Sequence, residues 1–183
     1  MNENVLSYSD IRHGDLPMPI PAFSGQFGVR ASHISCGENF VMAVTKQNEL
    51  WGWGKNTEGQ LGLGYISRAV FKPTKVQVGG LSVKNVSCGE THSLILSLHN
   101  QVYSCGSAES GKLGLGGIKS SSIITYPQLI TEPKDFKDIS KIFAGSEHSV
   151  ALTSKGQVFT WGSGFMGKLG HGGQDNQLIP KKV

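Results

Sequence analysis

The stretch Ile142–Gly172 reads IFAGSEHSVALTSKGQVFTWGSGFMGKLGHG, and its pattern occurs twice more in the chain. Val86–Gly116 reads VSCGETHSLILSLHNQVYSCGSAESGKLGLG, and Ile34–Gly64 reads ISCGENFVMAVTKQNELWGWGKNTEGQLGLG. The three copies align without a gap, so only the connecting segments differ in length. Repetition at a period of about 50 residues is typical of propellers, solenoids and arrays, whose units bury their apolar faces against neighbouring units. The sequence therefore predicts a repeated scaffold whose units begin near residues 34, 86 and 142.

Composition places the chain among globular proteins with a mild basic bias. Its 183 residues include 25 glycines, and 17 basic against 13 acidic residues give a formal net charge of +4. The glycines recur at matched positions, which indicates turns and close packing rather than low complexity. No window approaches the roughly 18 consecutive apolar residues of a membrane helix, and the N-terminus lacks the features of a signal peptide. These features predict no membrane span and an intracellular location, either cytoplasmic or nuclear.

The three cysteines agree with a reducing compartment. Cys36 and Cys88 occupy equivalent positions in neighbouring copies, one whole unit apart, so we expect no disulfide between them. Cys105 takes the slot that Trp53 and Trp161 hold in the other copies, which indicates a packing role. We therefore predict no metal site at these cysteines.

Each copy contains three short strand signals, the last two of which are joined by a tight turn that ends in Asn or Gly. A fourth, proline-led segment follows each copy, and we predict that these segments are the outermost strands because proline is confined to sheet edges. They are Pro73–Val76, Pro127–Ile130 and Pro180–Val183, with an earlier echo at Pro17–Ile20. Four antiparallel strands per unit are typical of a propeller blade. The predicted fold is all-β: a partial β-propeller of about three four-stranded blades over residues 17–183, after an unassigned segment 1–16.

At this point the repeat resembles that of the regulator of chromosome condensation family. The resemblance rests on a small residue–Gly–x–x–His–Ser strand, a Trp-Gly, a Gly-x-x-Gly-x-Leu-Gly tract and a trailing Pro-x-x-Val, which recur in this order in all three copies with departures at single positions. It implies a seven-bladed propeller, which three units cannot close. We interpret the chain as a fragment of a longer protein, with a ring built from several chains and an open arc as alternatives. Copy one has Phe40 in place of the histidine and copy two has Cys105 in place of the tryptophan; both changes lose a polar group, which favours packing roles.

The repeated positions are interpreted as structural rather than catalytic. His92 and His148 are two copies of one slot, and we expect their ring nitrogens to bond neighbouring backbone between blades. The tracts GSAESGK and GSGFMGK imitate a phosphate loop, but leucine follows where Ser or Thr would hold magnesium, and neither opens a helix. We predict no catalytic residue, no cofactor and no metal. The structural positions are Gly37, Gly89, Gly145, His92, His148, Trp53, Trp161, Gly54, Gly106 and Gly162.

Partner recognition is expected at the loops on the two rims of the propeller. The stretches that vary most between copies are Tyr65–Lys72, Ile118–Tyr126, Thr131–Lys141, which we expect to be an exposed loop, and Gln174–Leu178. The candidate contact residues are Lys134, Asp135, Lys137, Asp138, Arg68 and Lys119. A further set, Glu38, Glu90 and Glu147, follows the glycine turns and is expected either to cap those turns or to line one rim.

Three functions remain open. The first is a non-catalytic protein-interaction module that presents rim loops to a protein partner within a larger chain or assembly, including self-association or further blades. The second, implied by the resemblance, is guanine-nucleotide exchange on a small Ran-like GTPase. The third is binding to chromatin or DNA, which a net charge of +4 supports weakly because nucleic-acid affinity depends on phosphate neutralisation.

Overall fold

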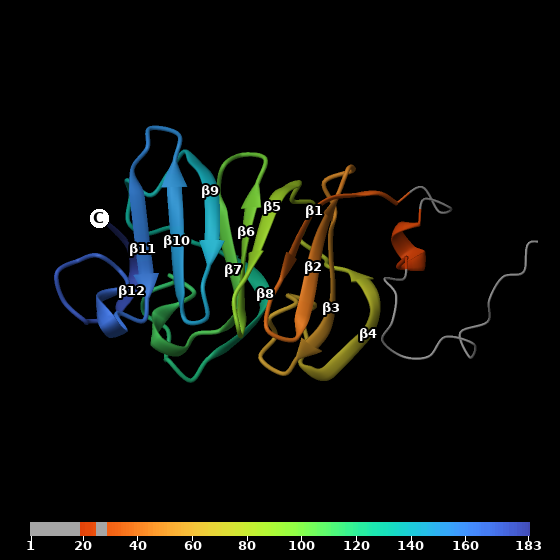
Figure 1. Cartoon of the computed structure of the whole chain (residues 1–183), viewed down its shortest axis with the longest axis horizontal. Helices are drawn as coiled ribbons and strands as arrows, with labels where there is room; N and C mark the ends of the chain where they lie inside the picture. The colour runs from red at the N-terminus through yellow and green to blue at the C-terminus, as the bar shows by residue number, and fades with distance from the viewer. Residues whose placement is uncertain (1–18, 25–28) are drawn as a thin grey trace, which may run out of the picture.

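Three four-stranded sheets stand side by side in the computed structural model, which describes residues 19–24 and 29–183 (Figure 1). Blade 1 consists of β1 (Ala31–Cys36), β2 (Phe40–Thr45), β3 (Leu50–Asn56) and β4 (Ser67–Lys75). Blade 2 consists of β5 (Val83–Cys88), β6 (His92–Ser97), β7 (Val102–Ser107) and β8 (Ile123–Leu129). Blade 3 consists of β9 (Ile139–Ala144), β10 (His148–Thr153), β11 (Val158–Gly162) and β12 (Gln177–Lys182). Three short 3-10 helices complete the described structure: η1 (Pro21–Phe23), η2 (Glu109–Gly111) and η3 (Phe165–Gly167).

Strand order confirms the predicted fold class. In each sheet the strands pair antiparallel in chain order, as expected of a propeller blade. The tight turns between the second and third strands end at Asn48, Asn100 and Gly156, whose φ angles are 60°, 60° and 79°. Asn and Gly tolerate this left-handed conformation better than other residues, which is why the hairpins could be placed from sequence.

The outermost strands differ from the prediction in where they begin. The prolines do not start these strands: Pro73, Pro127 and Pro180 lie inside β4, β8 and β12. Each is close to a bulge, where the register shifts between Gly52 and Gly54 and at the equivalent points of the other blades. An edge strand tolerates proline because one side of its backbone has no partner strand.

All four stretches that were predicted to vary between copies are partly strand, since Thr131–Lys141 enters β9 at Ile139 and Gln174–Leu178 enters β12 at Gln177. Tyr65–Lys72 contributes most of its length to β4, and Ile118–Tyr126 runs into β8. In the early echo, Pro17 and Met18 lie outside the described residues, and Pro19 and Ile20 are not in a strand. The segment 1–16 also lies outside the described residues, and the domain limits 17–183 stay a prediction.

The apolar core lies between blades rather than within them. Met42 and Val44 of β2 are buried in one cluster with Val86 and Ile95 of blade 2. A second cluster repeats the arrangement one blade further, and its members include Leu94, Leu96, Ile142 and Ala151. Each blade thus buries its face against the next one, as the repeat pattern predicted.

A repeated pair of hydrogen bonds fixes the distance between neighbouring blades. Ser93 Oγ donates to the Gln60 carbonyl at 2.7 Å, and Ser149 Oγ donates to the equivalent Lys112 carbonyl at 2.8 Å. Near the inner edge, the Cys88 amide donates to Ser35 Oγ at 3.0 Å. The Ala144 amide repeats this bond to Ser87 Oγ at 2.9 Å. These bonds satisfy polar groups that blade stacking removes from water.

Side chains at the tryptophan position of the repeat donate hydrogen bonds to the same two carbonyls. Trp161 Nε1 donates to the Lys112 carbonyl at 3.0 Å, and Cys105 Sγ donates to the Gln60 carbonyl at 3.5 Å. The expectation that Cys105 loses the polar function of the slot is therefore wrong, because the thiol replaces the indole as a weak donor.

His92 bonds a side chain of blade 3, Ser149, and not the backbone, so the expected bond from its ring nitrogen to neighbouring backbone is wrong. Its Nε2 lies 2.9 Å from Ser149 Oγ, and because that hydroxyl already donates to the Lys112 carbonyl, His92 Nε2 is the donor of this bond. The ring is fully buried, and burial, followed by the nearby charges of Lys112 and His148, lowers its pKa to about 3. His92 is therefore neutral in the folded chain.

Glycine precedes each ring of this slot for a steric reason. A Cβ on Gly89 would lie 2.5 Å from His92 Nδ1 and 2.5 Å from the Gly145 carbonyl oxygen of the next blade. Gly37 and Gly145 face the rings of Phe40 and His148 in the same way. These glycines let the ring and the next blade approach the backbone.

Gly89→Ala is expected to lower the free energy of unfolding by about 1–3 kcal/mol, because overpacking must displace either the ring or the neighbouring blade. Urea denaturation followed by circular dichroism measures this change. Gly173→Ala is the matched control, since a Cβ there meets nothing within 4 Å. Equal midpoints for the two variants would contradict the steric argument.

The neutral His92 makes stability depend on pH in a defined window. The unfolded chain binds a proton near pH 6.5, whereas folded His92 resists it until about pH 3, so stability is present above pH 6.5 and is lost as pH falls. His92→Phe copies blade 1, where Phe40 fills the slot. Between pH 7 and pH 5 the wild-type chain should lose about 2 kcal/mol more unfolding free energy than this variant. Parallel pH profiles from urea titrations would rule out this effect of His92.

Candidate protein-interaction surfaces

Loops project from two opposite edges of the blades. The hairpin rim comprises the turns after β2, β6 and β10 and the linkers 76–82 and 130–138 between blades. The glycine rim comprises the turns after β1, β5 and β9 and the long loops 57–66, 108–122 and 163–176. In the view of Figure 1 they form the upper and lower edges.

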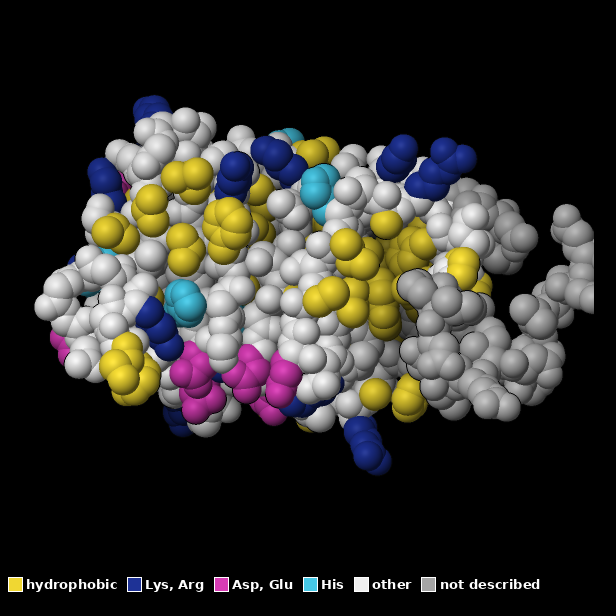
Figure 2. Space-filling model, viewed as in Figure 1, with side chains coloured by type: hydrophobic (Ala, Val, Ile, Leu, Met, Phe, Trp, Pro, Cys, Tyr) yellow, Lys and Arg dark blue, Asp and Glu magenta, His cyan; other side chains and the backbone are white. Residues whose placement is uncertain are grey.

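The two rims differ in charge. Figure 2 shows Lys and Arg side chains along the upper edge and a group of acidic side chains at the lower edge. Exposed bases at or near the hairpin rim are Arg30, Lys46, Lys84, Lys134, Lys137, Lys141 and Lys155. The hairpin rim is thus richer in bases than the glycine rim, although it also carries the exposed acids Glu132, Asp135 and Asp138.

The linker 130–138 is anchored more firmly than its polar sequence predicts. The Phe136 ring packs edge-on against Phe159 and Trp161, with ring centroids 5.3 and 5.5 Å apart. Ile130 and Ile139 are buried at the two ends of the linker. The expectation that the whole stretch Thr131–Lys141 is an exposed loop is therefore wrong, and Ile139 already begins β9.

Charged side chains between these anchors point outward. Lys134, Asp135, Lys137 and Asp138 are all exposed, and the Ser154 amide donates to the Asp138 carbonyl at 2.9 Å. That bond ties the linker to the hairpin after β10. The result is a rim element with a fixed backbone and four free charged side chains.

A shallow groove continues from this linker to the outer strand of blade 3. It measures about 270 Å³ and is lined by Pro133, Asp135 and Phe159 on one side and by residues of β12 on the other. Lys181 and Lys182 of β12 contribute positive charge to it. An apolar floor flanked by charges of both signs suits a polypeptide ligand better than a small anion.

The glycine rim carries the repeated acidic turns. Glu38, Glu90 and Ser146 line one open cleft of about 480 Å³ near the inner strands, and Ser146 Oγ bonds Glu90. Glu147 pairs instead with Lys168 at 4.0 Å, which is a weak surface interaction.

The other predicted contact residues do not join the linker. Lys119 lies in the loop 108–122 of the glycine rim, and Arg68 lies in β4 rather than in a loop. Both are exposed. Of the six predicted residues, four therefore lie in the linker 130–138 of the hairpin rim, Lys119 lies on the glycine rim and Arg68 lies in a strand, because copy-to-copy variation does not identify the edge from which a segment projects.

The histidine–serine pairs do not have the chemistry of a nucleophilic site. The Ser149 hydroxyl donates its hydrogen bond to the Lys112 carbonyl, and His92 is fully buried with a pKa far below neutrality. The phosphate-loop imitations form the short helices η2 and η3, and Lys112 is buried with its Nζ 3.8 Å from Glu109. Neither tract presents a row of amides at a helix N-terminus.

Residues 19–24 and 29–183 contain no cluster of three potential metal ligands. Across the same ranges, no helix is long and apolar enough to cross a membrane. The three cysteines are free thiols.

Comparison with known proteins identifies the repeat. The sequence model described as "Regulator of chromosome condensation (RCC1) repeat" matches residues 47–96, 99–152 and 155–183. A second model with the same description matches residues 31–60, 83–112 and 139–168, which are the three blades without their outer strands.

Curated relatives are much longer than this chain. Human E3 ubiquitin-protein ligase HERC2 is 38% identical over 177 residues, which cover 92% of the chain and 4% of that protein. The Arabidopsis thaliana ultraviolet-B receptor UVR8 is 33% identical over 91% of the chain and 36% of its own length. Because the chain spans so little of these relatives, their whole-protein activities are not transferred to it.

Superposition on solved structures supports the same family. Prp20p from Saccharomyces cerevisiae superposes with a TM-score of 0.75 and 30% identity over 86% of this chain and 39% of its own. Human WBSCR16 superposes with a TM-score of 0.73 and 28% identity over 84% of this chain. With the repeat matched over nearly all the described residues, this chain belongs to the regulator of chromosome condensation (RCC1) repeat family.

Proposed function

We propose that this chain is a non-catalytic protein-interaction module that recognises a protein partner through its hairpin rim. The observation that carries the proposal is the linker 130–138, whose backbone is anchored by Phe136 while Lys134, Asp135, Lys137 and Asp138 remain exposed. Charges on a preorganised backbone bind with less loss of conformational entropy than charges on a free loop. The groove beside β12 extends this surface.

Relatives support a protein ligand. The Prp20p structure is described with its binding properties to Gsp1p and histones, and another structure shows Kap60 bound to yeast RCC1 (Prp20). These partners belong to those proteins; for this chain they favour a macromolecular ligand over a small molecule. The free thiols agree with an intracellular setting, which is part of the proposal.

Nucleotide exchange on a small GTPase is the second candidate. The human X-linked retinitis pigmentosa GTPase regulator is 36% identical over 82% of this chain, although the match covers 14% of that protein. A GTPase could also be the protein partner without exchange taking place. Chromatin binding ranks third because the basic edge is interrupted by Asp135 and Asp138.

Reversal of two linker charges tests the proposed surface. The double variant Lys134→Glu/Lys137→Glu should recover at least about tenfold less of a partner captured by the wild-type chain from a lysate, because like charges across an interface cost several kcal/mol. The amount recovered is measured by quantitative mass spectrometry. Lys119→Glu, which reverses the charge of another exposed lysine on the glycine rim, should retain the partner.

If the linker variant recovered as much partner as the wild-type chain, the result would contradict binding at the hairpin rim. Release of fluorescent GDP from a panel of small GTPases, measured with micromolar chain, separates the two candidates. Faster release that Lys119→Glu abolishes and the linker variant retains would favour exchange through the glycine rim.

A further inference from the structure

The glycine-rich loops of blades 1 and 2 share one backbone arrangement. In blade 1 the Gly59 amide donates to the Asn56 carbonyl at 3.3 Å, and in blade 2 the Gly111 amide donates to the Ala108 carbonyl at 3.0 Å. In both loops the third residue further along, again a glycine, donates to the carbonyl of this glycine at 2.9 Å. The last glycine of each loop bonds the outer strand of the next blade. The two loops can therefore be compared residue by residue.

In blade 1 the side chain of Asn56 occupies the space inside the loop. It is fully buried, and its carboxamide bridges two backbone groups. Oδ1 accepts from the Leu61 amide at 3.1 Å, and Nδ2 donates to the Tyr65 carbonyl at 2.8 Å. This bridge closes the loop and gives the buried Leu61 amide its partner.

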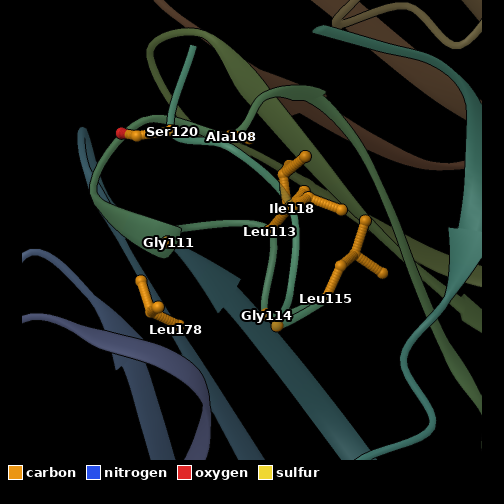
Figure 3. Close-up of a pocket in the computed structure, with 9 residues that line it drawn as sticks. Ala108, Gly111, Leu113, Gly114, Leu115, Ile118, Ser120 and Leu178 are labelled. Carbon is orange, nitrogen blue, oxygen red and sulfur yellow. The ribbon is translucent and has the colours of Figure 1, made fainter. Parts of the chain in front are cut away.

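Blade 2 has Ala108 in place of this asparagine, and a cavity of about 120 Å³ lies beside it. Figure 3 shows the residues that line the cavity. Ala108, Leu113 and Gly114 belong to its buried part, whereas Ile118 and Leu178 are 38% and 54% exposed. The cavity thus extends from the surface to the position that the Asn56 carboxamide has in blade 1.

The backbone groups that the asparagine bridges in blade 1 are present in blade 2 as well. Leu113 corresponds to Leu61 and is fully buried, and its amide donates to no acceptor in the part of the chain that the structure describes. Gly117 corresponds to Tyr65, and no described group donates to its carbonyl. The residues on both sides of Gly117 line the cavity. Buried amides without a partner are rare in folded proteins, so the Leu113 amide indicates an acceptor from outside the chain.

Blade 3 fills the corresponding space with its own backbone. Gly164 stands at the position of Ala108, and a Cβ on it would lie 2.3 Å from the Asp175 carbonyl oxygen. The Gly164 amide also donates to Asn176 Oδ1 at 3.0 Å. The loop of blade 3 and the Asn56 side chain of blade 1 thus each occupy a space that remains open in blade 2.

We propose that the cavity of blade 2 binds a primary carboxamide, the group that Asn56 supplies in blade 1. The oxygen of this carboxamide accepts from the Leu113 amide, and its NH2 group donates to the Gly117 carbonyl. Leu115 and Leu178 contact the carbon atoms that carry the group. A volume of about 120 Å³ suits one such group, because it exceeds the roughly 15 Å³ that one water needs and is smaller than the roughly 300 Å³ of a pocket for a larger ligand.

Two sources can supply this chemistry. One is the side chain of an asparagine or glutamine of a protein partner, and the other is a small free amide. The cavity belongs to the loop 108–122 of the glycine rim and not to the linker 130–138. The proposal is therefore independent of binding at the hairpin rim.

Titration of the wild-type chain with propanamide, followed by ¹H–¹⁵N NMR, tests the site. The Leu113 amide proton should shift downfield along a saturable curve, because it gains an acceptor. Butanone has the same number of heavy atoms and an oxygen acceptor but no N–H donor, so it should bind about threefold more weakly or worse. A Leu113 resonance that does not move, or that moves without saturation, overturns the proposal. Equal affinity for butanone also overturns it, because the NH2 group would then contribute nothing.

Ala108→Asn supplies the carboxamide from the chain itself, as in blade 1. This variant should lose the response to propanamide, and its Leu113 amide proton should lie downfield before any ligand is added. Ala31→Asn makes the same change at an exposed position of β1 and should bind propanamide like the wild-type chain. Wild-type affinity of Ala108→Asn for propanamide contradicts the assigned site.

N-acetylglutamine methylamide distinguishes the two sources, because it carries the same carboxamide on a peptide backbone. We expect it to shift the Leu113 resonance and to compete with propanamide, since the cavity extends to the surface. This result would support a side chain of a protein partner as the ligand. A response to propanamide alone would support the carboxamide site with a free amide as its ligand.

Discussion

The carbonyl groups of Gln60 and Lys112 hold the blades together. Each belongs to a glycine-rich loop and accepts two side-chain hydrogen bonds from the next blade: Ser93 and Cys105 bond Gln60, and Ser149 and Trp161 bond Lys112. A buried carbonyl without a donor is costly, so the next blade must supply donors at defined places. This requirement sets the stacking, and the apolar clusters on either side fill the space that it defines.

The constraint explains why the repeat imitates catalytic motifs. The His92–Ser149 pair has the residue types of a nucleophilic dyad, but its hydroxyl is committed to the Lys112 carbonyl and its ring is buried and neutral. The lysine of the phosphate-loop imitation contributes its backbone carbonyl to the seam. In both cases the residues were recognisable from sequence because they recur, and their recurrence reflects packing between blades.

Repetition also decided what could be predicted. The inner three strands of every blade were located from sequence because their alternation and their Asn or Gly turns appear three times. The starts of β4 and β8 were misread as loops because edge strands pair on one side only and tolerate irregular sequence. The anchoring role of Phe136 was not predicted, because a single aromatic residue in a polar linker has no periodic pattern. The rings that it packs against are Phe159 and Trp161 of blade 3.

Other parts of the scaffold either contact a neighbouring blade or present charged side chains at a rim. The linker 130–138 does both. Residues between two blades, such as Ser149, are buried, whereas residues of the turns, such as Lys155, are exposed to solvent. Phe136 belongs to the junction of blades 2 and 3, while Lys134 and Lys137 beside it belong to the rim. Phe23 packs on Trp51 and Trp53 as Phe136 packs on Phe159 and Trp161, so the same device precedes blade 1. The packing of Phe136 between blades 2 and 3 therefore fixes the linker backbone that presents Lys134 and Lys137. In this way the stacking of blades determines the position of the charges that a partner would contact.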